Sequence, residues 1–149
     1  MAEEWTRGGY TISTDPARVD VDVVHGFLRE SYWSPGIPRE TVERAIAGSL
    51  NFGVYQGEAQ VGFARVATDY ATFGYVMDVF ILPEHRGKGL SVWLMQTMLA
   101  HPRLRGFRVW RLATRDAHGV YAKVGFTPVA NPANLMEINN PDVYHNQAG

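Results

Sequence analysis

The feature that most constrains the fold is a Gly-rich loop between a strand-like run and a helix-like run. Residues 75–82 read YVMDVFIL, residues 83–91 read PEHRGKGLS, and residues 91–100 are mostly apolar. The first turn of a helix has backbone N–H groups without partners, and the helix dipole favours negative charge there. Gly87 and Gly89 carry no side chain, so the backbone can approach a ligand closely. The junction predicts a phosphate or pyrophosphate site, with an ordinary Gly-rich turn as the alternative.

Two common nucleotide motifs do not explain this loop. The Walker A motif needs Ser or Thr after Gly-Lys and a Gly further upstream, but Gly89 follows Gly87-Lys88 here. The dinucleotide fingerprint Gly-x-Gly-x-x-Gly begins at Gly87 and is broken by Val92. The predicted anion site, with Arg86 and Lys88 adding charge at its rim, is therefore of another kind.

Composition favours one globular domain, predicted to span residues 1–149 with a polar tail from about Asn139. The chain has 149 residues, 46% of them hydrophobic, and a net charge of -1, which does not indicate a nucleic-acid surface. With no cysteine, disulfides, thiolate catalysis and Cys-based zinc sites are excluded, and no metal site is predicted. The sequence has no apolar run of membrane-spanning length and no secretion signal in residues 1–5, so we expect a cytoplasmic protein without a membrane partner.

Hydrophobic periodicity and turn residues predict an α+β fold with a mixed, mostly antiparallel central sheet and helices on both faces. The predicted helices are residues 20–32, 39–50, 89–100 and 116–124. The predicted strands are residues 11–14, 51–55, 60–68, 72–82, 107–113 and a last strand from Phe126.

A second segment lies one strand and one helix beyond the loop: residues 117–126 read AHGVYAKVGF. Together with RGKGLS at residues 86–91, preceded by Ile81-Leu82-Pro83, it resembles the GNAT superfamily of N-acetyltransferases, as a small, single-domain, bacterial-type member. The family's loop reads Arg/Gln-x-x-Gly-x-Gly/Ala, and its second signature reads Ala-x-x-hydrophobic-Tyr-x-x-x-Gly-Phe. The resemblance covers about residues 11–138. It implies a GNAT-like fold and transfer of an acetyl group from acetyl-CoA to an amine.

The resemblance implies a set of residues for acetyl-CoA, the predicted cosubstrate. The pyrophosphate would bind the N–H groups from Gly87 to Val92, and the pantetheine arm would pair with the strand edge before the loop. Ser91 replaces the family's usual Gly or Ala, and Thr114 stands where many members carry Asn. The predicted acetyl-CoA residues are Val79, Phe80, Ile81, Arg86, Gly87, Lys88, Gly89, Leu90, Ser91, Val92 and Thr114.

Tyr121 matches the family's general acid, which protonates the departing CoA thiolate. A phenol has a pKa of about 10, so it is protonated at neutral pH and able to donate. The alternative is a tyrosine that only packs in the core.

The general base is less well defined by the sequence. Met77 aligns with the Glu that many members use, and the neighbouring Asp78 is the predicted catalytic carboxylate. Strand alternation directs Asp78 to the opposite face unless a bulge intervenes. His118, Asp69 and a water relay remain open as alternatives, and Asp78 is equally well explained as a structural carboxylate.

The resemblance places the acceptor opposite the CoA arm, against the first two helices, the loop between them and the last strands. Tyr32, Trp33, Asp69 and Tyr70 are the predicted substrate residues, and Ser34, Ile37 and Phe73 lie in the same segments. Aromatic residues beside carboxylates suit a cationic amine. A small-molecule amine is the first prediction, and a protein N-terminus or lysine is the second.

Two other classes of protein are kept as alternatives, a non-catalytic acyl-CoA-binding module and an anion-binding structural domain. The sequence does not distinguish acetyl-CoA from a longer acyl-CoA. A homodimer is left open, with Trp5 or Trp110 at its interface.

Overall fold

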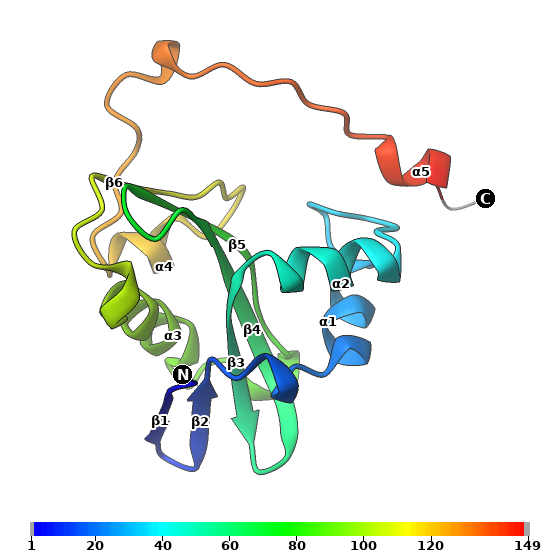
Figure 1. The fold of residues 1–149 in the computed structure, drawn as a ribbon, viewed down its shortest axis with the longest axis vertical. Helices are drawn as coiled ribbons and strands as arrows, with labels where there is room; N and C mark the ends of the chain where they lie inside the picture. Colours follow the sequence, from blue (N-terminus) through cyan, green and yellow to red (C-terminus); the bar gives the residue numbers. More distant parts are fainter. Residues whose placement is uncertain (1, 148–149) are drawn as a thin grey trace.

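The computed structural model describes residues 2–147 and contains a single six-stranded sheet within them. The strands are β1 Glu4–Arg7, β2 Tyr10–Ser13, β3 Leu50–Gln56, β4 Ala59–Thr68, β5 Phe73–Ile81 and β6 Val109–Arg111, and they lie in this order across the sheet (Figure 1). Neighbouring strands are antiparallel from β1 to β5, and β6 is parallel to β5. The prediction of an α+β fold with a mixed, mostly antiparallel sheet is confirmed.

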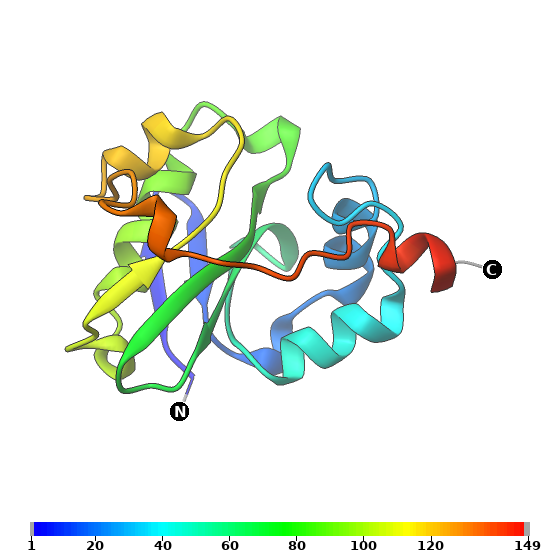
Figure 2. The same ribbon diagram turned by 90° about the horizontal axis from the view of Figure 1, so that it is seen from above.

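Helices cover both faces of the sheet, as predicted (Figures 1 and 2). The helices are α1 Val21–Leu28, α2 Arg39–Ala47, α3 Leu90–Leu99, α4 His118–Ala122 and α5 Val143–Gln147. One buried cluster lies between the sheet and α3, where Leu94, Met95 and Met98 are fully buried. A second cluster lies under α1 and α2 and includes Phe63 and Phe80.

Several predicted elements are shorter in the structure. The first helix ends at Leu28 rather than Tyr32, because the chain turns there and the Ser31 hydroxyl donates to the Leu28 carbonyl at 2.7 Å. The second helix ends at Ala47, and Leu50 instead begins β3. The predicted strand 107–113 and the predicted helix 116–124 contract to β6 and α4, while α3 and the central strands match within two residues.

Strand β1 was not predicted. It forms a hairpin with β2 around Gly8 and Gly9, both of which have positive φ. Trp5 in this strand stacks on Phe52, with ring centroids 6.4 Å apart, so it contributes to the core of the sheet.

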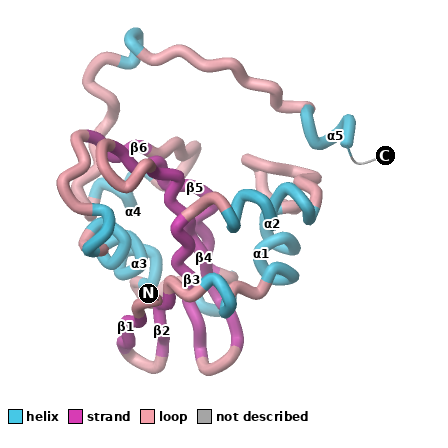
Figure 3. The backbone as a smooth tube through the Cα atoms, in the orientation of Figure 1, coloured by secondary structure: helices cyan, strands magenta, loops and turns pink. Residues whose placement is uncertain are grey.

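The predicted strand from Phe126 is wrong. The chain after Phe126 joins no strand and runs as an exposed arm, residues 127–142, which crosses the molecule toward α1 and α2 (Figures 1 and 3). Prolines at positions 128, 132 and 141 interrupt it, and proline cannot donate to a strand ladder. Helix α5 follows within the predicted polar tail, and Tyr144 packs against the second buried cluster.

Candidate active site

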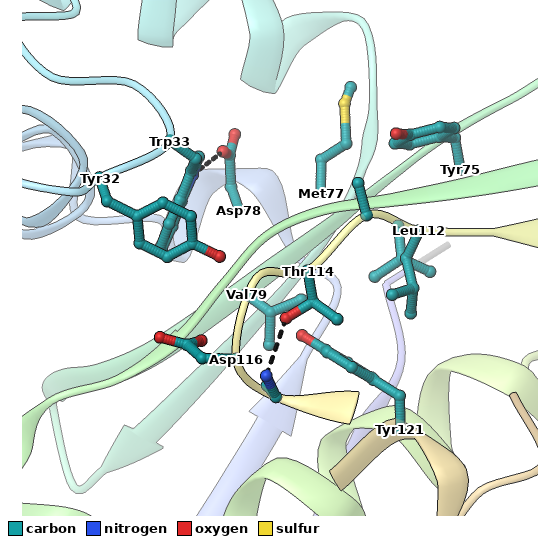
Figure 4. A pocket seen from close by; sticks show the side chains of 13 residues that line it. Tyr32, Trp33, Tyr75, Met77, Asp78, Val79, Leu112, Thr114, Asp116 and Tyr121 are labelled. Atoms are coloured by element: carbon teal, nitrogen blue, oxygen red, sulfur yellow. Dashed lines mark hydrogen bonds between the residues drawn. The ribbon is translucent and has the colours of Figure 1, made fainter. Parts of the chain in front are cut away.

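The site lies where β5 and β6 separate. The two strands pair only between residues 73–75 and residues 109–111. Beyond Tyr75, β5 continues beside β4 but no longer pairs with β6. The chain after β6 turns toward α4, and a cavity of about 310 Å³ opens between the two segments (Figure 4). It is lined by Tyr32, Trp33, Tyr75, Val76, Met77, Asp78, Val79, Leu112, Ala113, Thr114, Asp116, Ala117 and Tyr121.

A β-bulge shapes the wall that β5 contributes. Phe63 pairs with Phe80 and Arg65 pairs with Met77, so two β5 residues face a single β4 residue. Asp78, in this bulge, has a φ of 57°. A bulge leaves the extra residue unpaired and re-aims the backbone, so polar main-chain groups of β5 become free to bind a ligand. The bulge also removes the strict alternation of faces, and both Met77 and Asp78 line the cavity.

Asp78 belongs to a hydrogen-bonded network rather than standing free. One carboxylate oxygen accepts from Arg65 Nε at 2.6 Å, and the other accepts from Trp33 Nε1 at 2.9 Å (Figure 4). The side chains of Arg65 and Asp78 are only 15% and 10% exposed, so this is a buried ion pair. It fixes the Trp33 indole over the cavity, which ties the loop after α1 to the middle of β5.

Tyr121 projects from α4 into the cavity (Figure 4). Its phenol ring packs edge-on against Phe126 with centroids 6.1 Å apart. Burial, reinforced by the nearby Tyr32 and Asp116, raises the pKa of the Tyr121 phenol above its ordinary value. The phenol therefore keeps its proton through neutral pH, which is the state required of a proton donor.

A second contact closes the cavity on the side of α4. The backbone N–H of Arg115 donates to the Tyr32 hydroxyl at 3.1 Å, and the Arg115 guanidinium lies over the Tyr32 ring at 3.8 Å from its centroid. The exposed carboxylate of Asp116 lies beside this contact (Figure 4). The rings of Tyr32 and Trp33 and the carboxylates of Asp78 and Asp116 therefore line one side of the cavity (Figure 4).

The Gly-rich loop has the conformation that its glycines predict. Gly87 and Gly89 have φ values of 79° and 76°, which a side chain would strain, and a Cβ at either position would meet open space. Helix α3 starts immediately afterwards with no side chain capping its N–H groups. The Arg86 guanidinium donates to the Ile81 carbonyl at 2.8 Å and so braces the loop. The free backbone donors that a pyrophosphate needs are therefore present at this helix start, while residues 86–92 do not line the cavity between β5 and β6.

The other predicted residues fall into two groups, those that line the cavity and those that lie outside it. Thr114 lines the cavity, and its hydroxyl oxygen accepts from Ala117 N at 3.0 Å near the start of α4. Val79 also lines it, whereas Phe80 and Ile81 are buried, so only their backbones remain as predicted ligand groups. His118 lines a neighbouring groove instead of the cavity.

Asp69 and Tyr70 are not brought to the cavity. Asp69 accepts from Thr72 and Ala71 in the exposed β4–β5 turn, and the Thr72 hydroxyl, followed by backbone N–H groups, holds its carboxyl pKa well below the usual range. Tyr70 stacks with Arg103 at 4.2 Å, beside a different surface depression. Ser34 and Ile37 are buried near α1, and Phe73 is exposed at the far end of β5.

Several residues of the site were not identified from the sequence, namely Arg65, Tyr75, Leu112, Ala113, Arg115 and Asp116. Asp116 stands directly before the second motif, and this position is the one available signal for it. The other residues reach the site through contacts between segments that are distant in the sequence. A single sequence carries no local signal for such contacts.

No cluster of three or more metal-ligating residues occurs among the described residues. None of the helices in residues 2–147 is long and apolar enough to cross a membrane.

Comparison with known proteins places this arrangement in a family. The model of an acetyltransferase (GNAT) domain matches residues 48–128. A Gibberella zeae protein described as a candidate acetyltransferase is 35% identical over 140 residues, covering 78% of each chain. A crystal structure of a candidate GNAT-family acetyltransferase from Xanthomonas campestris pv. campestris is 48% identical, with a TM-score of 0.89 over 93% of this chain and 99% of that one.

A Clostridium acetobutylicum acetyltransferase solved with acetyl-CoA shares the fold, with a TM-score of 0.64 and 16% identity over 93% of this chain and 96% of that one. The chain belongs to the GNAT acetyltransferase family, as the two motifs predicted. It is therefore an acyltransferase of the class that uses acetyl-CoA.

Proposed function

We propose that the chain transfers the acetyl group of acetyl-CoA to the primary amine of a small molecule, in the cavity between β5 and β6. The observation that carries the proposal is that the bulged strand β5 and the Tyr121 phenol face the same cavity. The uncapped start of α3 would bind the pyrophosphate, and β5 would hold the pantetheine amides by strand-like pairing.

In the proposed reaction the amine nitrogen bonds to the acetyl carbon, and the carbon–sulfur bond then breaks. A backbone N–H at the bulge would stabilise the charge that develops on the carbonyl oxygen. Tyr121 would give its proton to the departing thiolate, and its raised pKa supports this role at neutral pH. The proton released by the amine would leave through water or a carboxylate of the cavity.

The amine is proposed to be that of a small molecule because of the size and lining of the cavity. A volume of about 310 Å³ lies in the range of small-molecule sites. The Tyr32 and Trp33 rings, together with the carboxylates of Asp78 and Asp116, suit a cationic group carried on an apolar body. We propose that Asp78, paired with Arg65, positions Trp33 and attracts the ammonium group of the amine. A role for Asp78 as the general base stays a prediction.

The test measures CoA release from acetyl-CoA across a panel of primary amines. The chain has no cysteine, so a thiol-reactive dye reports only the released CoA. Tyr121→Phe should lower kcat by roughly 10²- to 10⁴-fold, the range expected for a lost general acid. Tyr75→Phe removes the same hydroxyl from another wall of the cavity and should leave kcat within about threefold. Equal rates for the two variants would remove Tyr121 from the mechanism.

A further inference from the structure

A second depression, with a volume of about 300 Å³, lies outside the candidate active site. Its walls come from the chain before β1, the turn after β2, the connection from α2 to β3, the β4–β5 turn and the chain after α3. None of its lining residues lines the cavity between β5 and β6. Tyr70, which the sequence predicts as a substrate residue, is one of the residues that line it.

Buried polar atoms without a partner gather at this second depression. Four buried side-chain atoms in residues 2–147 have no hydrogen-bond partner, and three of them belong to lining residues, namely Glu3, Asn51 and His101. Asn51 and His101 are only 4% and 1% exposed. Buried polar atoms are normally hydrogen-bonded, so three unpaired ones in one place are a reason to expect a polar ligand.

The surrounding hydrogen bonds determine what each unpaired atom can do. The Arg103 backbone N–H donates to His101 Nδ1 at 3.1 Å, and burial lowers the pKa of His101, so the ring is neutral with its proton on Nε2. That nitrogen lies 2.8 Å from Glu3 Oε2 without the direction of a hydrogen bond, and it cannot bind a metal ion. Asn51 Nδ2 donates to two backbone carbonyls at 2.9 and 3.3 Å, so Oδ1 is its free acceptor. The two free oxygens, on Glu3 and Asn51, suit a cationic donor such as an ammonium group.

The second depression also carries a cation and an apolar wall. The Arg103 guanidinium stacks on the Tyr70 ring, 4.2 Å from its centroid, and forms no ion pair with the carboxylates that the structure describes. A guanidinium held flat on a ring keeps its N–H groups free for a carboxylate. Ile46 and Leu50 add an apolar surface. A ligand that carries an ammonium, a carboxylate and an apolar side chain matches these groups.

A continuous set of hydrogen bonds joins the second depression to the acceptor side of the active site. The Ser49 hydroxyl, at its wall, accepts from Arg65 Nη1 at 3.0 Å. Arg65 Nε donates to Asp78 at 2.6 Å, and Asp78 in turn accepts from the Trp33 indole. Asn51 also pairs directly with Arg65 across β3 and β4. A ligand that shifts Ser49 or Asn51 therefore acts on Arg65, whose ion pair determines the position of Trp33.

We propose that the second depression is an effector site, which binds a small α-amino acid with an apolar side chain and transmits its occupancy to Trp33. The ammonium group binds Glu3 and Asn51, and the carboxylate binds Arg103. The apolar side chain lies against the end of α2. The proposal concerns binding alone, so it is independent of the reaction proposed above.

The first experiment titrates the full chain, without acetyl-CoA, with three related compounds and follows the backbone amide signals by NMR. L-leucine should shift the signals of Glu3, Asn51, Tyr70 and Arg103. N-acetyl-L-leucine lacks the ammonium and L-leucinamide lacks the carboxylate, so each should bind roughly tenfold more weakly or worse. Absence of any shift, equal affinity for the three compounds, or shifts centred on the cavity between β5 and β6 would overturn the proposal.

The second experiment measures the affinity for L-leucine in two pairs of variants. Arg103→Leu and Glu3→Gln remove the two charges of the second depression, and each should weaken binding roughly tenfold. The matched controls are Arg105→Leu and Glu58→Gln, at exposed positions outside it, and their affinity should stay within about twofold of the wild type. Unchanged affinity in Arg103→Leu or in Glu3→Gln would contradict the proposed site.

The third experiment follows the link to the active site through the indole N–H signal of Trp33. L-leucine should shift this signal in the wild type. Ser49→Ala removes the hydroxyl that accepts from Arg65, so the variant should still bind L-leucine while its Trp33 signal stays in place. A Trp33 signal that L-leucine leaves unmoved in the wild type, or moves equally in Ser49→Ala, would overturn the proposed transmission.

Discussion

The two halves of the candidate site are built from different parts of the chain. The proposed donor half consists of the loop before α3 and the bulged strand β5, and its proposed binding groups are main-chain atoms held by positive φ angles at Gly87, Gly89 and Asp78. The acceptor half consists of side chains held by tertiary contacts, chiefly Trp33 on Asp78 and Arg115 on Tyr32.

This difference determines what each half tolerates. Main-chain donors survive most side-chain changes but depend on backbone conformation, so a single Cβ at the wrong glycine is harmful. Side-chain walls depend on pairs of residues and can be changed one residue at a time. We therefore expect donor binding to be the constant part of the site and acceptor choice to be its adjustable part.

The largest expected effect is on stability, through the ion pair that anchors the acceptor half. Asp78→Ala leaves the Arg65 guanidinium buried without its carboxylate, and such a change costs about 3–5 kcal/mol. Denaturant unfolding measures the loss. Glu30→Ala breaks the exposed pair with Arg29 and should cost at most about 1 kcal/mol. If both variants lose equally little, the buried pair does not anchor this half of the site.

The second prediction concerns the donor half and compares two glycines. Gly89→Ala puts a Cβ on a left-handed residue and should destabilise the loop by about 1–2 kcal/mol, weakening acetyl-CoA binding roughly tenfold. Gly26→Ala places the same methyl group in open space on α1 and should instead stabilise the fold by about 0.5–1 kcal/mol. Calorimetric titration with acetyl-CoA and thermal unfolding measure both. Unchanged affinity in Gly89→Ala would mean that the loop is not the donor site.

The third prediction concerns the acceptor wall. Trp33→Phe keeps an aromatic ring but removes the indole N–H that donates to Asp78. A hydrogen bond to a charged group at a partly exposed site is worth about 1 kcal/mol, so the KM for the amine should rise roughly fivefold. The KM for acetyl-CoA should not change. A rise in the KM for acetyl-CoA alone would place Trp33 in the donor half.

The smallest expected effect is the change of kcat with pH that comes from the titration of Tyr121. This residue lies where the two halves of the site meet. Its pKa in the folded chain is raised above that of a free phenol, about 10, because the ring is buried. Loss of the acid by deprotonation should therefore reduce kcat only above about pH 10. The contribution of this raised pKa to the free energy of unfolding is complete at pH values below the pKa of Tyr121 in the unfolded chain. It is lost as the pH rises through the pKa of Tyr121 in the folded chain.

A pH–rate profile of wild type and Tyr121→Phe measures this effect. The variant should lack the alkaline decrease. A wild-type decrease that begins well below pH 10, and persists in the variant, would belong to another group and would contradict the assignment.

The sequence was informative where structure depends on local conformation. Gly87 and Gly89 specify positive φ angles, and these short-range preferences predicted the loop and the start of α3. The family was indicated by the resemblance of two sequence motifs. The sequence did not predict the bulge firmly, because Asp78 rather than a glycine adopts the positive φ within it.

Tertiary pairing accounts for what the sequence did not predict. The contact between Trp33 and Asp78 joins residues 45 apart, and that between Tyr32 and Arg115 joins residues 83 apart. The segment around Met136 and Ile138 has the alternation of a strand, yet a strand forms only beside another strand. The sequence does not say which strand edge supplies that partner.

We propose that the site joins a main-chain donor half to a side-chain acceptor half. Initial rates over a grid of acetyl-CoA and amine concentrations test it most directly, for wild type, Gly89→Ala and Trp33→Phe. We expect Gly89→Ala to raise only the KM for acetyl-CoA and Trp33→Phe to raise only the KM for the amine. The same shift in both constants from either variant would contradict the division of the site.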